Sequence, residues 1–179
     1  MRRAWPLLLL LALLCGAAPA GALPLPEDEL KAAFLYKFGG YIDWPPGTFP
    51  RPDSAIVIGV AGNPTLADAL QRLIRGRRIA ERPLRLLRLD PHDDLSDIHI
   101  LFIGENDEFS ALLKRSAELP ILTVTDQEAF DLGPYATISF VREDNRLRFD
   151  VALDEARRRG MRINARLLAL ARHIRGRPT

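Results

Sequence analysis

Cysteine is almost absent from this chain of 179 residues, in which Cys15 is the only one. Cys15 lies in the first 22 residues, which have the features of a secretory signal peptide. We therefore expect the exported protein to have no cysteine, which excludes disulfide bonds, a thiol nucleophile and cysteine-based metal sites. Only three histidines are present and none stands in a paired ligand motif, so we expect neither a metal centre nor a bound cofactor.

Motifs for catalysis are lacking as well. No serine stands in G-x-S-x-G. Residues 61–64 (AGNP), after the first expected strand, form neither a P-loop nor G-x-G-x-x-G. A receiver-like site would need acidic residues at the ends of the first and third strands, where the sequence has Ala61-Gly62 and Gly104-Glu105. The sequence therefore predicts a protein that is not an enzyme.

The first residues favour export. Arg2 and Arg3 precede an apolar stretch at residues 7–14, and Ala20-Gly21-Ala22 fits the A-x-A cleavage pattern. An uncleaved membrane anchor is the alternative, but the dense apolar stretch of eight residues is far shorter than the roughly 20 that span a bilayer. Leu14 is bulky for a lipoprotein signal, which disfavours lipid attachment at Cys15. We expect a signal peptide at 1–22, a single domain at 23–179 and a periplasmic location.

Charge is balanced once this leader is set aside. The chain has 25 basic and 23 acidic residues, and the leader contains two arginines and no acidic residue, which leaves 23 of each. The arginine clusters at 75–78 and 157–159 are therefore better interpreted as solvated helix ends than as a nucleic-acid site.

Apolar runs alternate with helical patterns along the rest of the chain. Strands are expected at 55–60, 84–89, 98–103 and 121–125, and helices near 27–41, 64–73, 109–117, 152–158 and 164–173. Segments 137–141 and 146–151 flank Glu143-Asp144-Asn145, a hairpin signal. The predicted fold is α/β: a mostly parallel central sheet with helices on both faces and a C-terminal antiparallel hairpin at its edge.

Several segments together resemble the YfiR family of periplasmic proteins. The similarity covers about residues 27–172 and rests on the order and spacing of these pieces: 31–38 (KAAFLYKF), 41–45 (YIDWP), 76–79 (GRRI), 82–84 (RPL), 99–104 (HILFIG), 122–126 (LTVTD), 148–153 (RFDVAL) and 163–171 (INARLLALA). The resemblance implies a homodimeric periplasmic repressor that binds the periplasmic region of an inner-membrane diguanylate cyclase. Such a repressor lowers cyclic di-GMP, and with it biofilm formation, and an outer-membrane lipoprotein can sequester it.

Two departures limit what the resemblance implies. The family's well-studied member has disulfide bonds, which this chain cannot form after export, so redox control through a disulfide is excluded. Glu81 also stands where a small glycine is expected in the family turn.

Two binding hypotheses follow. The first is docking of a membrane sensor protein on the C-terminal edge, with Phe140 and Leu167 as apolar anchors if they are exposed, and Arg148, Asp150 and Asn164 setting register. Arg148 and Asp150 should face solvent if Phe149 faces inward.

The alternative is a periplasmic small-ligand-binding module, because open α/β sheets bind ligands at the carboxyl ends of their strands. That rim would be formed by these residues: Ala61, Gly62, Gly104, Glu105 and Asp126.

Overall fold

The computed structural model describes residues 25–105, 107–126 and 135–176; the expected signal peptide lies outside these residues. Within them, the α-helices are α1 (Glu27–Phe38), α2 (Pro64–Ile74), α3 (Ser110–Arg115), α4 (Leu153–Arg158) and α5 (Ala165–Leu168). The strands are β1 (Ile42–Asp43), β2 (Ile56–Ala61), β3 (Arg78–Ile79), β4 (Arg82–Leu89), β5 (Ile100–Ile103), β6 (Leu122–Thr125), β7 (Ile138–Glu143), β8 (Arg146–Ala152), β9 (Arg162–Ile163) and β10 (Ile174–Arg175). Short 3₁₀ turns, η1 (Asp107–Phe109) and η2 (Ser116–Glu118), flank α3. None of the described helices has the length and hydropathy required to cross a membrane.

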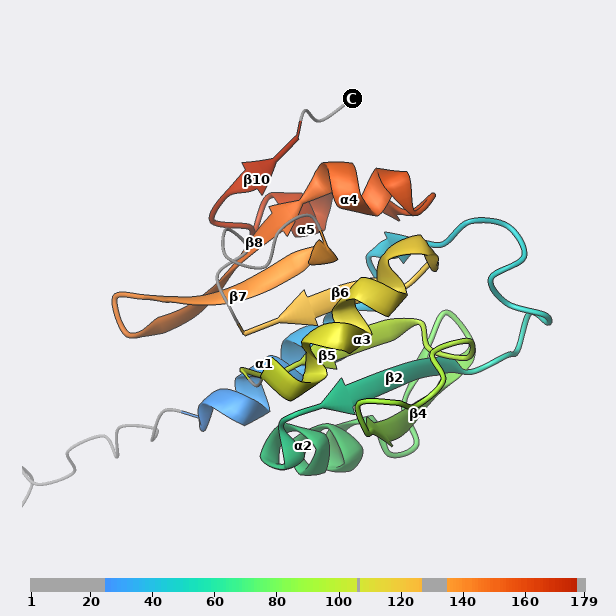
Figure 1. The fold of residues 1–179 in the computed structure, drawn as a ribbon, viewed down its shortest axis with the longest axis horizontal. Helices are drawn as coiled ribbons and strands as arrows, with labels where there is room; N and C mark the ends of the chain where they lie inside the picture. Colours follow the sequence, from blue (N-terminus) through green and yellow to red (C-terminus); the bar gives the residue numbers. More distant parts are fainter. Residues whose placement is uncertain (1–24, 106, 127–134, 177–179) are drawn as a thin grey trace, which may run out of the picture.

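The main sheet has the strand order β10-β8-β7-β6-β5-β2-β4-β3 (Figure 1). Strands β4, β2, β5, β6 and β7 run parallel, and β7 pairs antiparallel with β8. Every residue of β2, β5 and β6 is buried, as the continuous apolar runs predict for strands covered on both faces. The predicted mostly parallel α/β fold is confirmed.

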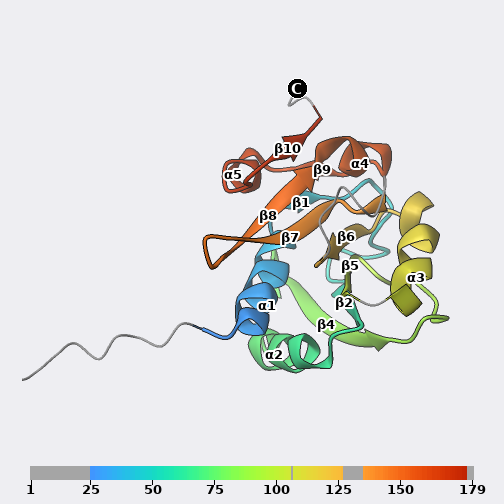
Figure 2. The same ribbon diagram turned by 60° about the vertical axis from the view of Figure 1, so that its left-hand side comes forward.

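Helices cover both faces of this sheet. Figure 2 shows α1 and α2 on one side of the strands and α3 on the other. Leu66 and Leu70 of α2 pack in one core cluster with α1, whereas Leu112 and Leu113 of α3 belong to a second cluster beneath the opposite face. Alternate residues of the buried strands supply each cluster.

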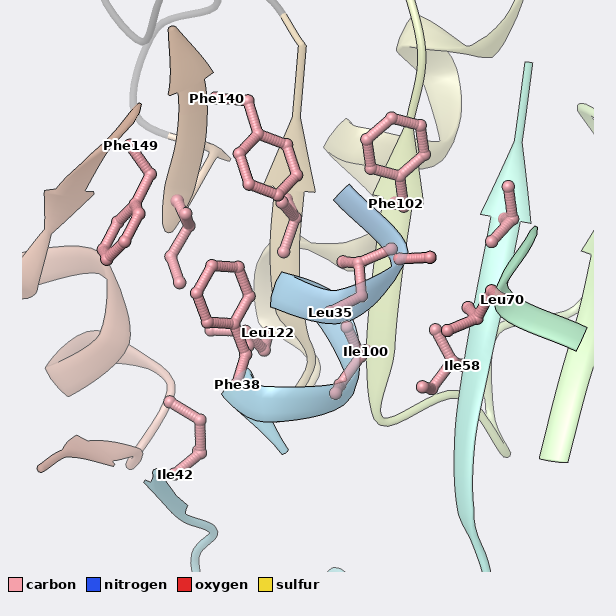
Figure 3. Close-up of a cluster of buried hydrophobic side chains, with 14 of the residues drawn as sticks. Leu35, Phe38, Ile42, Ile58, Leu70, Ile100, Phe102, Leu122, Phe140 and Phe149 are labelled. Carbon is pink, nitrogen blue, oxygen red and sulfur yellow. The ribbon is translucent and has the colours of Figure 1, made fainter. Parts of the chain in front are cut away.

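An aromatic group forms the centre of the larger core. Phe34 and Phe38 from α1 meet Phe140 of β7 and Phe149 of β8, with ring centroids 5.3–6.0 Å apart. In Figure 3 Phe38 of α1 lies among Leu122, Phe140 and Phe149, and Leu35 lies nearer Ile100. The first helix is thereby fixed against the C-terminal hairpin.

The hairpin turn follows the predicted chemistry. Asp144 and Asn145 both adopt positive φ, at 47° and 58°. A two-residue turn of this kind matches the twist of the strands, and Asn and Asp tolerate it better than most residues.

The segment after α5 differs from the prediction. The expected helix over 164–173 ends at Leu168, and β10 then adds in parallel to β8. The backbone N–H of Arg172 donates to Phe149 O, and Val151 N–H donates to His173 O. The backbone groups of this segment therefore pair with the open edge of β8 instead of forming the hydrogen bonds of a helix. The pair β1–β9 was also missed, because strands of two residues carry no readable alternation.

Replacing Phe149 by alanine should destabilise the protein. The ring is fully buried against Phe34 and Phe38, so Phe149→Ala leaves a cavity and should cost about 3–5 kcal/mol of unfolding free energy. Urea unfolding measures this. The control Leu170→Ala, at a side chain 58% exposed, should change stability by less than about 0.5 kcal/mol. Equal losses in the two variants would contradict this core.

Candidate functional site

A crevice lies where the order of the sheet reverses. From β2 the chain passes through α2 to β4, while β5 and β6 lie on the other side of β2. Since α2 and α3 cover opposite faces, the loops after β2 and β5 separate at the carboxyl ends of the strands, which is where open α/β sheets bind ligands.

Glycine is needed where these two loops touch. The N–H of Gly104 donates to Ala61 O at 3.0 Å. A Cβ on Gly104 would stand 2.9 Å from the carbonyl oxygen of Gly62, closer than real side chains come. The small residues after β2 and β5 thus let the backbones meet and leave the space above them open.

A cavity of about 600 Å³ occupies this space. Its lining includes four of the five rim residues predicted from the sequence, namely Gly62, Gly104, Glu105 and Asp126, whereas Ala61 is buried beneath them. The sequence did not predict the other lining residues: Glu27, Lys31, Asn63, Phe140, Val141, Arg142 and Leu147.

A buried lysine occupies one wall of the cavity. Lys31 of α1 has a side chain only 9% exposed, and its Nζ lies 2.8 Å from both Glu27 Oε1 and Asp126 Oδ1. Arg142 of β7 pairs with the second oxygen of Glu27. These ion pairs join the first helix, the end of β6 and the hairpin. The available signal in the sequence was the Glu27–Lys31 spacing of four, which places both side chains on one face of a helix.

Asp126 carries an electrostatic penalty. Burial raises the pKa of its carboxyl above the usual 3.8, and the nearby carboxylates of Glu105 and Asp28 act in the same direction. Lys31 lowers this pKa by a hydrogen bond and by its charge, but less than burial raises it. Lys31, which also pairs with Glu27, therefore does not fully offset the free-energy cost of burying the charged Asp126 carboxylate.

The N-terminus of α2 borders the cavity but is already capped. Asn63 Oδ1 accepts a hydrogen bond from the N–H of Leu66 at 2.9 Å, which satisfies a backbone donor in the first turn of α2. Its Nδ2 donates to Asp28 Oδ1 at 3.0 Å, so its amide is used on both sides.

The predicted partner-binding residues have different surroundings. Phe140 and Leu167 are both 2% exposed and pack in the core, so the condition for their acting as apolar anchors is not met. Their strand and helix are covered by α1 and by the neighbouring C-terminal elements. Arg148 and Asn164 are exposed, and their role in partner binding stays a prediction.

Asp150 was expected to face solvent, but it is buried. Phe149 points into the core, so the predicted alternation is correct, but the segment after α5 covers the outer side of β8. Arg172 donates two hydrogen bonds to Asp150, at 2.9 and 2.7 Å, and the backbone N–H of His173 donates a third. Asp150 therefore anchors the C-terminal segment.

Metal binding finds no support in residues 25–105, 107–126 and 135–176, where no three His, Cys, Asp or Glu side chains are grouped closely enough to hold an ion. Of the carboxylates that line the cavity, Glu27 and Asp126 pair with Lys31, and Glu105 makes no ion pair with the described residues.

Removing the Lys31 charge should destabilise the protein in a pH-dependent way. Lys31→Met leaves Asp126 as an uncompensated buried carboxylate, at a cost of about 3–5 kcal/mol near neutral pH. Because the folded-state pKa of Asp126 is raised, the folded protein binds a proton more tightly than the unfolded chain, and stability is regained as pH falls through that pKa.

Urea unfolding at several pH values measures this effect. Arg88→Met is the matched control, since its pair with Asp68 is exposed and contributes only about 0–1 kcal/mol. A loss in Lys31→Met that stays constant from neutral to acidic pH would show that Asp126 does not depend on Lys31.

Comparison with known proteins identifies the family. A search of curated proteins finds no significant match. A family model described as YfiR/HmsC-like matches residues 28–172, which is most of the chain and includes both the crevice and the C-terminal segment. Proteins of this family are periplasmic regulators in cyclic di-GMP signalling rather than enzymes. The chain belongs to the YfiR/HmsC-like family.

Proposed function

We propose that this protein is an exported repressor that binds the periplasmic region of an inner-membrane diguanylate cyclase and keeps the cyclase inactive. The observation that carries the proposal is the family match across residues 28–172. Cyclic di-GMP then falls because the cyclase is held in its inactive state by contact with the repressor, and biofilm formation falls with it.

The C-terminal segment supplies the proposed contact surface. Strand β10 is the last strand on its side of the sheet, and an edge strand offers backbone N–H and C=O groups to a partner. Leu170 and Ile174, 58% and 37% exposed, lie in this segment and replace Phe140 and Leu167 as apolar anchors. Arg148 and Asn164 provide polar contacts nearby, of the kind that sets register and specificity.

Two further contacts belong to the proposal. The protein acts as a homodimer, and an outer-membrane lipoprotein relieves repression by sequestering it. Both extend the resemblance to the YfiR family, and both are compatible with recognition by a preformed surface.

Deleting the gene in its host should raise cyclic di-GMP, measured in cell extracts, and wild-type protein should restore the lower level. Leu170→Asp and Arg148→Glu should fail to restore it, since each places a negative charge on the proposed surface. The control is Arg85→Glu, at an exposed arginine of β4 near the opposite edge of the sheet. This variant should restore the lower cyclic di-GMP level fully.

Unchanged cyclic di-GMP after deletion would refute the repressor role. Full activity of both surface variants, with normal amounts of folded protein, would move the contact to another part of the molecule.

A further inference from the structure

The outer edge of β4 is mostly open. Strand β3 pairs with β4 only at Arg82 and Pro83, and it is the last strand on this side of the sheet. Residues 84–89 pair with β2 on their inner side and with no strand among the described residues on their outer side. An edge of this length displays backbone hydrogen-bonding groups that another chain can use.

The turn before β4 shows which of its residues present these groups. Residues 80–81 have positive φ, at 45° and 66°, and form a two-residue turn. The residues that close such a turn, Ile79 and Arg82, exchange backbone hydrogen bonds, and alternate residues of a strand direct their backbone groups to the same side. The outward-facing residues of the open edge are therefore Leu84, Leu86 and Arg88. Within the part of the chain that the structure describes, no backbone group of a turn or loop bonds to them.

Positive charge gathers along this edge. Residues 75–88 contain six arginines and a single acidic residue, Glu81. Arg78 pairs with Glu81, and Arg88 pairs with Asp68 of α2. Arg85 is exposed and makes no ion pair with the described residues. The open edge therefore carries an excess of positive charge, although the charge of the whole chain is nearly balanced.

A second copy of this chain fits the edge poorly. Antiparallel pairing of two β4 strands about residues 86–87 would place Arg85 opposite Arg88, and like charges directly opposite one another are destabilising. A strand with acidic side chains at these two positions would instead pair with both arginines.

The leucines of the edge define the rest of the occupant. Leu84, Leu86 and Leu87 are half-buried and stand beside the two arginines, so apolar side chains would match them. A free anion or a lipid head group could meet the arginines, but it would leave the outward backbone groups unused. Charge complementarity together with the open backbone thus favours an acidic strand from another protein.

We propose that the outer edge of β4 binds an extended acidic segment of a protein partner, which adds to the sheet as a further strand. Its backbone pairs with Leu84, Leu86 and Arg88, and acidic residues three positions apart meet Arg85 and Arg88. In strand addition the backbone hydrogen bonds provide affinity, and the side chains provide specificity. The edge lies at the opposite end of the sheet from β10, so the proposal does not rest on the repressor role.

Three synthetic peptides test this binding mode. The purified protein is titrated at constant ionic strength with acetyl-SVEVTEVS-amide, with its glutamine analogue acetyl-SVQVTQVS-amide, and with acetyl-SPEPTEPS-amide, whose prolines interrupt both backbone edges. Amide NMR shifts give the affinity, and hydrogen exchange reports new backbone hydrogen bonds. The first peptide should slow exchange at the amides of Leu84, Leu86 and Arg88. The glutamine analogue should bind about five-fold more weakly, and the proline peptide should not bind.

Equal binding of the glutamine or the proline peptide would overturn the proposal, as would binding of the first peptide without slower exchange at the β4 amides. Vesicles of phosphatidylglycerol test the lipid alternative. If they shift the β4 amides while the first peptide does not, the edge is a lipid contact and the proposal fails.

Matched variants locate the charged contacts. Arg85→Gln and Arg88→Gln should each weaken binding of the first peptide about two- to five-fold, as is typical of exposed ion pairs. The control Arg166→Gln, at an exposed arginine of α5, should leave the affinity unchanged. Equal affinity in all three variants would overturn the proposal.

Charge reversal separates this edge from the C-terminal surface. Arg85→Glu should lose binding of the first peptide and still lower cyclic di-GMP, because the two surfaces lie at opposite ends of the sheet. Retention of peptide binding by this variant would overturn the proposal, whatever its effect on cyclic di-GMP.

Discussion

The ammonium group of Lys31, shared between Glu27 and Asp126, connects the parts of this molecule that form its crevice. Helix α1 lies across one face of the sheet, and its aromatic residues fix it to the β7–β8 hairpin. The ion pairs of Lys31 and Arg142 extend that attachment to the end of β6 and over the carboxyl ends of the strands. Breaking a buried pair on one side leaves an unpaired charge, so the arrangement constrains α1, the end of β6 and the β7–β8 hairpin.

The hairpin borders both the crevice and the proposed C-terminal surface. Its residues Phe140 and Leu147 line the crevice, while Arg148 is exposed beside the C-terminal segment. That segment is held by Asp150, which accepts hydrogen bonds from Arg172 and from the backbone of His173. The described residues contain no cysteine, and the C-terminal segment is held by a buried ion pair and strand pairing instead of a disulfide. Salt screens such contacts, whereas oxidation does not affect them.

Much of the fold could be predicted because buried parallel strands are apolar on both faces. The runs 55–60 and 98–103 differ from β2 and β5 only at their ends. Edge elements were missed, since β10 and the β1–β9 pair depend on the backbone groups that neighbouring strands leave open. Burial of Phe140 and Leu167 was equally hidden, because alternation shows which side a residue faces but not what covers that side.

The rim of the crevice, including its carboxylates Glu105 and Asp126, was predictable from topology, but its cations were not. Gly62, Gly104 and Asp126 follow strands directly, whereas Lys31 and Arg142 reach the same place from a helix and a distant strand. The dependence of Asp126 on Lys31 is tested most directly by carbon-13 NMR titration of the Asp126 carboxyl in the wild-type protein and in Lys31→Met. A pKa above the usual 3.8 that rises further in Lys31→Met is expected. A pKa at or below that value, or one that Lys31→Met leaves unchanged, would contradict it.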